Sequence, residues 1–115
     1  MSLDVYLYFP VDVGRDEPES HTVYEANITH NLNKMADEAG IYDCLWRPDE
    51  HGIERAEQII EPLSKGLADL RNRPQHYEQF SASNGWGTYK DFVPWCERYL
   101  EACREYPKAF VRASR

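Results

Sequence analysis

Residues 26–34 read ANITHNLNK, and hydrogen-bonding side chains gather there at the point where the apolar spacing becomes helical. If the stretch is helical, one side of the helix carries a polar stripe composed of Asn27, His30, Asn31, Lys34 and Glu38. Histidine and asparagine side chains both donate and accept hydrogen bonds, and a helix start offers free backbone amides that favour an anion. The stretch therefore predicts a contact surface for a phosphate, a carboxylate or the edge of a base.

Helix capping is the structural alternative for the same residues. The side-chain oxygen of Asn27 or Thr29 can cap a helix by accepting a hydrogen bond from an unpaired backbone amide, and His30 can bond a neighbouring backbone carbonyl. A cap needs only one such residue, whereas the stripe holds several. Both interpretations stay open at the level of the sequence.

Two further stretches combine tryptophan with polar residues, namely LWRP at residues 45–48 and NGWGTY at residues 84–89. Trp46 offers a flat ring beside the forked N–H donors of Arg47. Asn84 and Gly85 favour a tight turn that leaves Trp86 accessible, although a loop tryptophan can instead cover the core from outside. We predict a ligand-binding site made up of Asn27, His30, Asn31, Lys34, Trp46, Arg47, Asn84 and Trp86.

The sequence holds no recognised catalytic or metal-binding motif. The histidines and cysteines lack metal-ligand spacing, and neither a phosphate-binding glycine loop nor a nucleophile elbow is present. We therefore assign no catalytic residue, no metal ligand and no cofactor, and we favour a non-catalytic protein. The rival class is a small hydrolase or transferase with His30 as general acid–base. Cys44 is the nearest candidate nucleophile, but its apolar surroundings favour an inert buried thiol.

Length and charge narrow the class of partner. The 115 residues fit one globular domain over residues 1–115, and 42% hydrophobic residues suffice for one core. The net charge of -7 repels phosphate backbones and anionic lipid, so we expect neither duplex nucleic acid nor a membrane as partner. The expected partner is a small anionic ligand or a host protein, and a homodimer is compatible with the composition. A third function class is an acidic antagonist whose loop at residues 12–19 mimics nucleic acid or grips a basic host protein.

We expect a cytoplasmic protein. The chain has no apolar run of the ~20 residues that a membrane-spanning helix requires, and no stretch typical of a signal peptide. Its odd number of cysteines is typical of a reducing compartment, because secreted proteins of this size usually pair their cysteines.

Periodicity predicts the elements that must position these residues. Alternating apolar residues indicate strands, and three- and four-residue spacing indicates helices. The expected strands cover residues 3–9, 21–25 and 109–113, and the expected helices cover residues 27–39, 53–70 and 88–103. Residues 41–48 fit either a strand or a short helix. Pro62 should bend the second helix, and Thr88 with Asp91 has capping-box spacing at the start of the third.

The element order predicts an α+β fold. We expect a small antiparallel sheet, formed by an N-terminal hairpin and a C-terminal strand, packed against about three helices. Leu3, Val5, Leu7 and Phe9 should face the helices. Tyr6 and Tyr8 then lie on the opposite face, where they either meet another layer or form an open aromatic patch.

The chain resembles a family of short phage and prophage proteins that have no established activity. The resemblance rests on ANITHNL with MADEAG within residues 26–40, on LWRP and NGWGTY, and on the closing EYPKAFVRASR. It covers most of the chain in one order. It implies an origin in a phage or mobile element, residence in the host cytoplasm, and an accessory role such as countering host defence. It implies no catalytic residue. We therefore expect a non-catalytic binding module.

Overall fold

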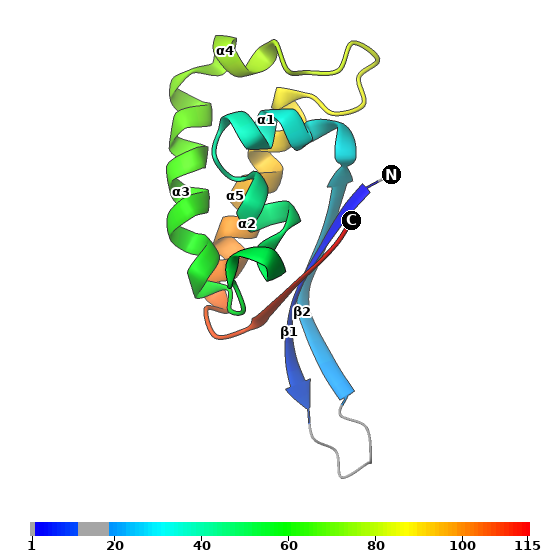
Figure 1. Ribbon diagram of the computed structural model, residues 1–115, viewed down its shortest axis with the longest axis vertical. Coiled ribbons are helices and arrows are strands. Elements are labelled where there is room, and N and C mark those ends of the chain that lie inside the picture. Colours follow the sequence, from blue (N-terminus) through cyan, green and yellow to red (C-terminus); the bar gives the residue numbers. More distant parts are fainter. Residues whose placement is uncertain (1, 12–18) are drawn as a thin grey trace.

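The computed structural model describes residues 2–11 and 19–115. Along the chain the elements are β1 (Ser2–Val11), β2 (Glu19–Thr29), η1 (His30–Leu32), α1 (Asn33–Glu38), α2 (Tyr42–Trp46), η2 (Pro48–His51), α3 (Glu57–Asn72), α4 (Pro74–Glu78), α5 (Tyr89–Glu105) and β3 (Phe110–Ser114). The strands that the structure describes form one antiparallel sheet in the order β2-β1-β3 (Figure 1). The predicted α+β fold is confirmed. Residues 12–18 of the acidic loop lie outside the described residues.

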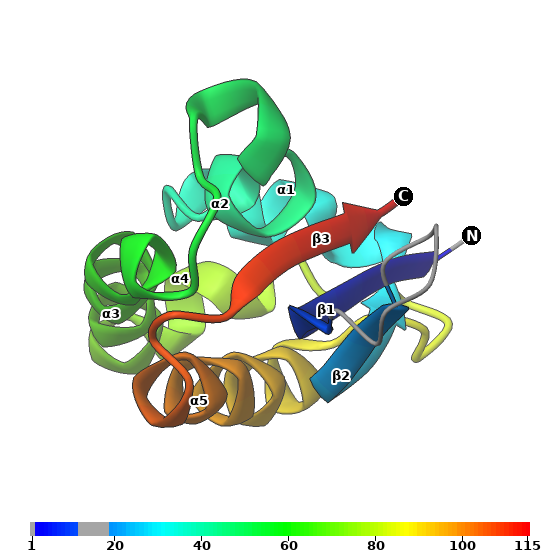
Figure 2. The same cartoon turned by 90° about the horizontal axis from the view of Figure 1, so that it is seen from below.

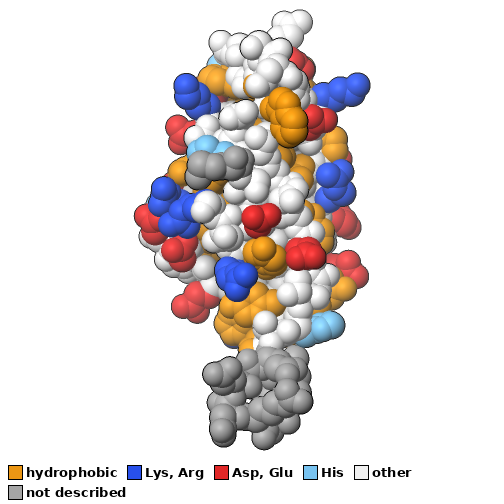
Figure 3. Space-filling model, turned by 90° about the vertical axis from the view of Figure 1, so that its right-hand side faces the viewer, with side chains coloured by type: hydrophobic (Ala, Val, Ile, Leu, Met, Phe, Trp, Pro, Cys, Tyr) orange, Lys and Arg blue, Asp and Glu red, His pale blue; other side chains and the backbone are white. Residues whose placement is uncertain are grey.

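The helices lie on one side of the sheet, as two views at right angles show (Figures 1 and 2). Leu3, Val5 and Leu7 point to that side and are fully buried. The terminal strands pair as expected, with Val5 opposite Ala113 and Leu7 opposite Val111. The side chains between them on β1 point the other way, onto a sheet face that Figure 3 views directly. This open face carries the tyrosines singled out above.

The long helices α3 and α5 pack against each other on the helical side of the sheet, which is the left in Figure 1. The predicted cap on α5 is present, because the backbone N–H of Asp91 donates to Thr88 Oγ1 at 3.3 Å. α3 begins at Glu57, later than the apolar spacing indicates, and runs as one helix through Pro62. Residues 41–48 form the short helix α2 and the start of η2, so the alternative of a strand is wrong.

The expected helix from Asn27 is wrong in its first turn. β2 continues to Thr29, with Asn27 opposite Asp4 and Ile28 opposite Leu3. Ile28 suits either period, and pairing with β1 buries it in the core. The carbonyl of Asn27 also accepts a hydrogen bond from Trp95 Nε1 on α5 at 2.9 Å. The polar stripe of a single helix is therefore divided between a strand end and the turn that follows it.

Asp69, Arg73 and Tyr77 fix the corner between α3 and α4, which leads into the loop at residues 79–88. Arg73 donates to both Asp69 oxygens, at 3.0 Å from Nε and 2.6 Å from Nη2, and the Tyr77 hydroxyl donates to Asp69 Oδ2. The Arg73 hydrogen bond, followed by that of Tyr77, lowers the pKa of Asp69 to about 2. The folded state therefore favours the ionised carboxylate.

This corner predicts an acid-sensitive contribution to stability. Because the pKa of Asp69 is depressed on folding, its contribution is present above about pH 4 and is lost as the pH falls towards 2. We expect Asp69→Asn to lower the melting temperature at pH 7 and to flatten the decline between pH 4 and 2. Tyr77→Phe is the matched control, because it keeps the larger Arg73 contribution and should retain most of that decline. Equal slopes in wild type and Asp69→Asn, measured by thermal melting, would contradict this assignment.

Candidate functional site

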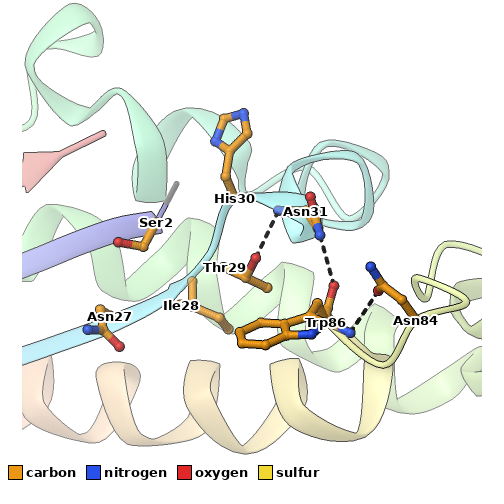
Figure 4. A pocket seen from close by; sticks show the side chains of 8 residues that line it. All are labelled: Ser2, Asn27, Ile28, Thr29, His30, Asn31, Asn84 and Trp86. Atoms are coloured by element: carbon orange, nitrogen blue, oxygen red, sulfur yellow. Dashed lines mark hydrogen bonds between the residues drawn. The ribbon is translucent and has the colours of Figure 1, made fainter.

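A hollow of about 640 Å³ lies where the end of β2, the turn η1 and the loop at residues 79–88 meet. We call it the tryptophan hollow. It is lined by Ser2, Asn27, Ile28, Thr29, His30, Asn31, Asn84 and Trp86 (Figure 4). Five of these residues belong to the site predicted from the sequence, and they come from segments more than fifty positions apart. Ser2, Ile28 and Thr29 were not predicted, because only the strand pairing brings them to this edge.

Two hydrogen bonds hold Trp86 at the edge of the hollow (Figure 4). Asn31 Nδ2 donates to the Trp86 carbonyl oxygen at 3.1 Å, which ties the loop to η1. The backbone N–H of Trp86 donates to Asn84 Oδ1 at 3.0 Å, within the loop itself. The loop is also closed by Ala82, whose N–H donates to the Gly87 carbonyl at 2.9 Å. The backbone of Trp86 is therefore fixed from both sides.

The indole of Trp86 is exposed. Its relative exposure is 69%, and no other large hydrophobic side chain among the described residues is exposed. The alternative that this tryptophan covers the core from outside therefore does not hold. Burying such a ring against a ligand would remove a large apolar area from water.

A second hollow of about 480 Å³ adjoins the first. We call it the lysine hollow, and it is lined by His30, Asn31, Asn33, Lys34, Phe80, Ala82, Ser83 and Asn84. It shares His30, Asn31 and Asn84 with the tryptophan hollow. Lys34 is its charged residue, whereas the lining of the tryptophan hollow contains no Lys, Arg, Asp or Glu. The pair thus combines an aromatic, amide-rich part with a part that holds one cation.

Trp46 and Arg47 line neither hollow. Trp46 is fully buried and stacks on Tyr42 with ring centroids 5.5 Å apart, so it has no exposed face for a ligand. Arg47 donates to Tyr42 Oη at 3.1 Å and to Glu50 Oε2 at 2.6 Å. These two bonds, the Glu50 one first, raise the pKa of Arg47 above its already high value. LWRP is therefore a core and surface-pairing segment in this fold.

His30 has a structural partner. Trp46 Nε1 donates to His30 Nδ1 at 3.3 Å. Because an indole N–H can only donate, Nδ1 must accept, and the ring proton lies on Nε2. Nε2 faces the side-chain amide of Asn33 at 3.3 Å, whose oxygen accepts this proton when the amide is turned. The ring points away from Trp86 in Figure 4. Both ring nitrogens thus have partners within the chain.

Cys44 does not form a nucleophile–base pair with His30. Its thiol donates to the Ile41 carbonyl at 3.3 Å, and burial raises its pKa to about 12. Cys96 and Cys103 are also buried free thiols, and burial raises the pKa of each. Within residues 2–11 and 19–115, no three His, Cys, Asp or Glu side chains converge as a metal site would require. The arrangement offers recognition by stacking and hydrogen bonding.

The bond between His30 and Trp46 gives a stability test. His30→Ala should leave the buried indole N–H unpaired and lower the free energy of unfolding by about 1–3 kcal/mol. Asn33→Ala is the matched control, because it removes the other partner of the same ring and should cost less. Urea unfolding followed by tryptophan fluorescence measures both variants. A cost for Asn33→Ala as large as that for His30→Ala would show that the indole bond is not the dominant one.

The close approach of Gly87 to η1 gives a second test. Gly85 and Gly87 both have positive φ, at 80° and 100°. A Cβ at Gly85 would have nothing within 4 Å, whereas one at Gly87 would lie 3.0 Å from Thr29 Cγ2 and 3.2 Å from Asn31 Cβ. Gly85→Ala should therefore cost only the backbone strain, about 1–2 kcal/mol. Gly87→Ala should cost more and move Trp86.

Thermal melting and acrylamide quenching of tryptophan fluorescence measure these two effects. We expect a larger melting decrease in Gly87→Ala, together with a changed accessibility of Trp86. The Gly85→Ala chain serves as the control for strain alone. Identical behaviour of the two variants would mean that the contact of Gly87 with Thr29 and Asn31 does not position the loop.

Comparison of the chain with protein-family models, with curated proteins and with solved structures gave no match. In the part of the chain that the structure describes, none of the helices has the length and apolar character needed to cross a bilayer.

Proposed function

We propose that this protein is a non-catalytic binding module for a nucleotide-like ligand. The observation that carries the proposal is the exposed Trp86 indole, held by Asn31 and Asn84 beside an amide-rich hollow. A planar base stacks on the indole in the tryptophan hollow. Its anionic group lies in the lysine hollow near Lys34. Stacking of a base on an aromatic side chain contributes about 1–3 kcal/mol.

The two asparagines offer complementary groups to the edge of a base. Asn31 uses its Nδ2 on the Trp86 carbonyl, which leaves Oδ1 as an acceptor. Asn84 uses its Oδ1 on the Trp86 N–H, which leaves Nδ2 as a donor. Neither remaining atom bonds another described residue. A base edge with one donor and one acceptor would satisfy both, as adenine does with its exocyclic amine and a ring nitrogen.

The charge distribution favours an anionic group that carries few charges. Lys34 is the one cation of the two hollows, and the chain as a whole carries -7. Arg47, which the sequence places in the site, is paired with Glu50 outside both hollows. One lysine suits a monophosphate better than a triphosphate, because further negative charge would meet no further cation.

Binding of adenosine and of adenosine monophosphate tests this proposal. Wild type should bind the monophosphate more tightly than the nucleoside in isothermal titration calorimetry. Trp86→Ala should weaken both ligands by roughly 5- to 150-fold, since it removes a stacking surface that contributes about 1–3 kcal/mol. Lys34→Ala should lower the monophosphate affinity towards that of adenosine and leave adenosine unchanged. Arg47→Ala is the control outside the hollows and should bind as wild type does.

The same titrations are repeated with nucleoside monophosphates that carry other bases. Guanosine, cytidine and uridine monophosphates establish which donor and acceptor pattern the asparagines prefer. If no nucleoside monophosphate binds wild type, or if Trp86→Ala and Lys34→Ala bind as wild type does, the proposal fails.

The wider role that we propose is an accessory protein of a phage or mobile element, acting in the host cytoplasm. It rests on the resemblance of ANITHNL, LWRP and NGWGTY to phage and prophage proteins. A small module that captures a nucleotide signal would suit the countering of host defence. Both hollows are lined by His30 and Asn31 of ANITHNL and by Asn84 of NGWGTY. This shared lining supports a link between the resemblance and the site.

A further inference from the structure

The sheet has an open face that the proposed binding function does not use. Across the middle of it, Glu25 on β2, Tyr6 on β1 and Arg112 on β3 lie opposite one another in one row. In the next row, Tyr8 lies opposite Phe110. Figures 1 and 2 place every helix on the other side of the sheet. The hydrophobic and charged groups of this face are seen together in Figure 3.

The centre of the open face is aromatic and ordered. Tyr8 and Phe110 stack with ring centroids 5.8 Å apart. The guanidinium of Arg112 lies over the Tyr6 ring at 4.7 Å, and that of Arg55 lies over Phe110 at 4.0 Å. The aromatic rings are only partly buried. A partner that covered them would remove apolar area from water at a surface whose side chains are already positioned.

The charges of the central row are opposite and are placed at opposite edges. Glu25 and Arg112 are both exposed and flank Tyr6. Neither forms an ion pair with another described residue. The row is therefore acidic at the β2 edge, aromatic in the centre and basic at the β3 edge. Such a pattern is complementary to itself when it is turned about an axis that runs along β1.

We propose that the open face packs against the same face of a second copy, about a two-fold axis parallel to β1. This rotation keeps each row opposite itself and exchanges the two edges of the sheet. Tyr6 then faces Tyr6 of the second copy, Asp4 on the same strand faces Asp4, and Glu25 faces Arg112 twice in the dimer. The contact is isologous, as in most symmetric dimers. Face-to-face packing of two sheets with nearly aligned strands is a common arrangement.

Two opposite pairs between Glu25 and Arg112, against one like pair of Asp4, favour this axis over the alternative. A two-fold axis across the strands would place Glu25 opposite Glu25 and Arg112 opposite Arg112, which is unfavourable on both edges. The charges also favour a protein partner over a single-stranded nucleic acid, although nucleic acids stack on exposed aromatic sheets. Glu25 and Asp4 both lie on this face, and their carboxylates would repel phosphates.

Charge reversal tests the proposal with the full chain. Glu25→Arg alone places two arginines opposite each other, and Arg112→Glu alone places two glutamates opposite each other. Each single variant should weaken the dimer at least about tenfold. An equimolar mixture of the two variants should recover dimers, because both facing pairs between positions 25 and 112 are again opposite in charge. Thermal melting of each variant establishes that it is folded.

Analytical ultracentrifugation and native mass spectrometry measure the oligomeric state. Wild-type dimers, monomeric single variants and heterodimers in the mixture would support the proposal. A wild-type protein that remains monomeric at a concentration of about 100 μM, at which even a weak specific dimer forms, would overturn the proposal. Dimers that neither reversal weakens, or a mixture that stays monomeric while both chains are folded, would also overturn it.

Two further experiments test whether the open face acts independently of the nucleotide site and whether it binds nucleic acid instead of a second copy. Trp86→Ala should remain dimeric, so its loss of nucleotide binding and a failure of dimerisation are independent results. Wild type is also titrated with a fluorescent single-stranded oligouridine. Binding that Tyr6→Ala abolishes, in a wild type that is monomeric, would assign the open face to nucleic acid and overturn the dimer.

Discussion

Backbone pairing along the central strand β1 sets the positions of the other parts of the molecule. β1 pairs with β2 on one side and with β3 on the other, so both neighbouring strands take their register from it. On the side towards β2 the pairing continues to Ser2 and Thr29. The chain can turn into η1 only after that pair, which places His30 and Asn31 at the edge of the sheet. The same register aligns Glu25, Tyr6 and Arg112 across the open face.

The sequence predicts the fold better than it predicts the site, for a physical reason. Alternation in β1 and the Thr88–Asp91 cap are local signals, and both lead to the observed elements. Ile28 fits a helical and a strand period equally well, and only its long-range partner Leu3 decides between them. Trp46 looks the same in the sequence whether buried or exposed. Its burial follows from the packing of α2, which no local pattern reveals.

The meeting of residues 26–31 with residues 84–86 also depends on contacts distant in the chain. Asparagine-rich and tryptophan-containing stretches can be singled out as unusual, but their composition does not say that they touch. The signal that comes nearest is Gly87, which follows Trp86 and permits the close approach to Thr29 and Asn31. A glycine beside an aromatic loop residue is equally typical of an ordinary tight turn. The sequence alone therefore cannot give the packing role.

Asn31 and Asn84 each use one polar side-chain atom to bond the backbone of Trp86, and the other polar atom bonds no described residue. These two bonds hold the loop in place in the free protein. The proposed ligand would therefore not lose binding free energy to the ordering of this loop. In the proposed dimer, a two-fold axis parallel to β1 leaves both tryptophan hollows at the same end of the assembly. Two sites facing one direction suit a ligand or partner with two nucleotide-like groups, because the second contact would then form at high effective concentration. The register of β1 would thus determine both the single site and the spacing between two.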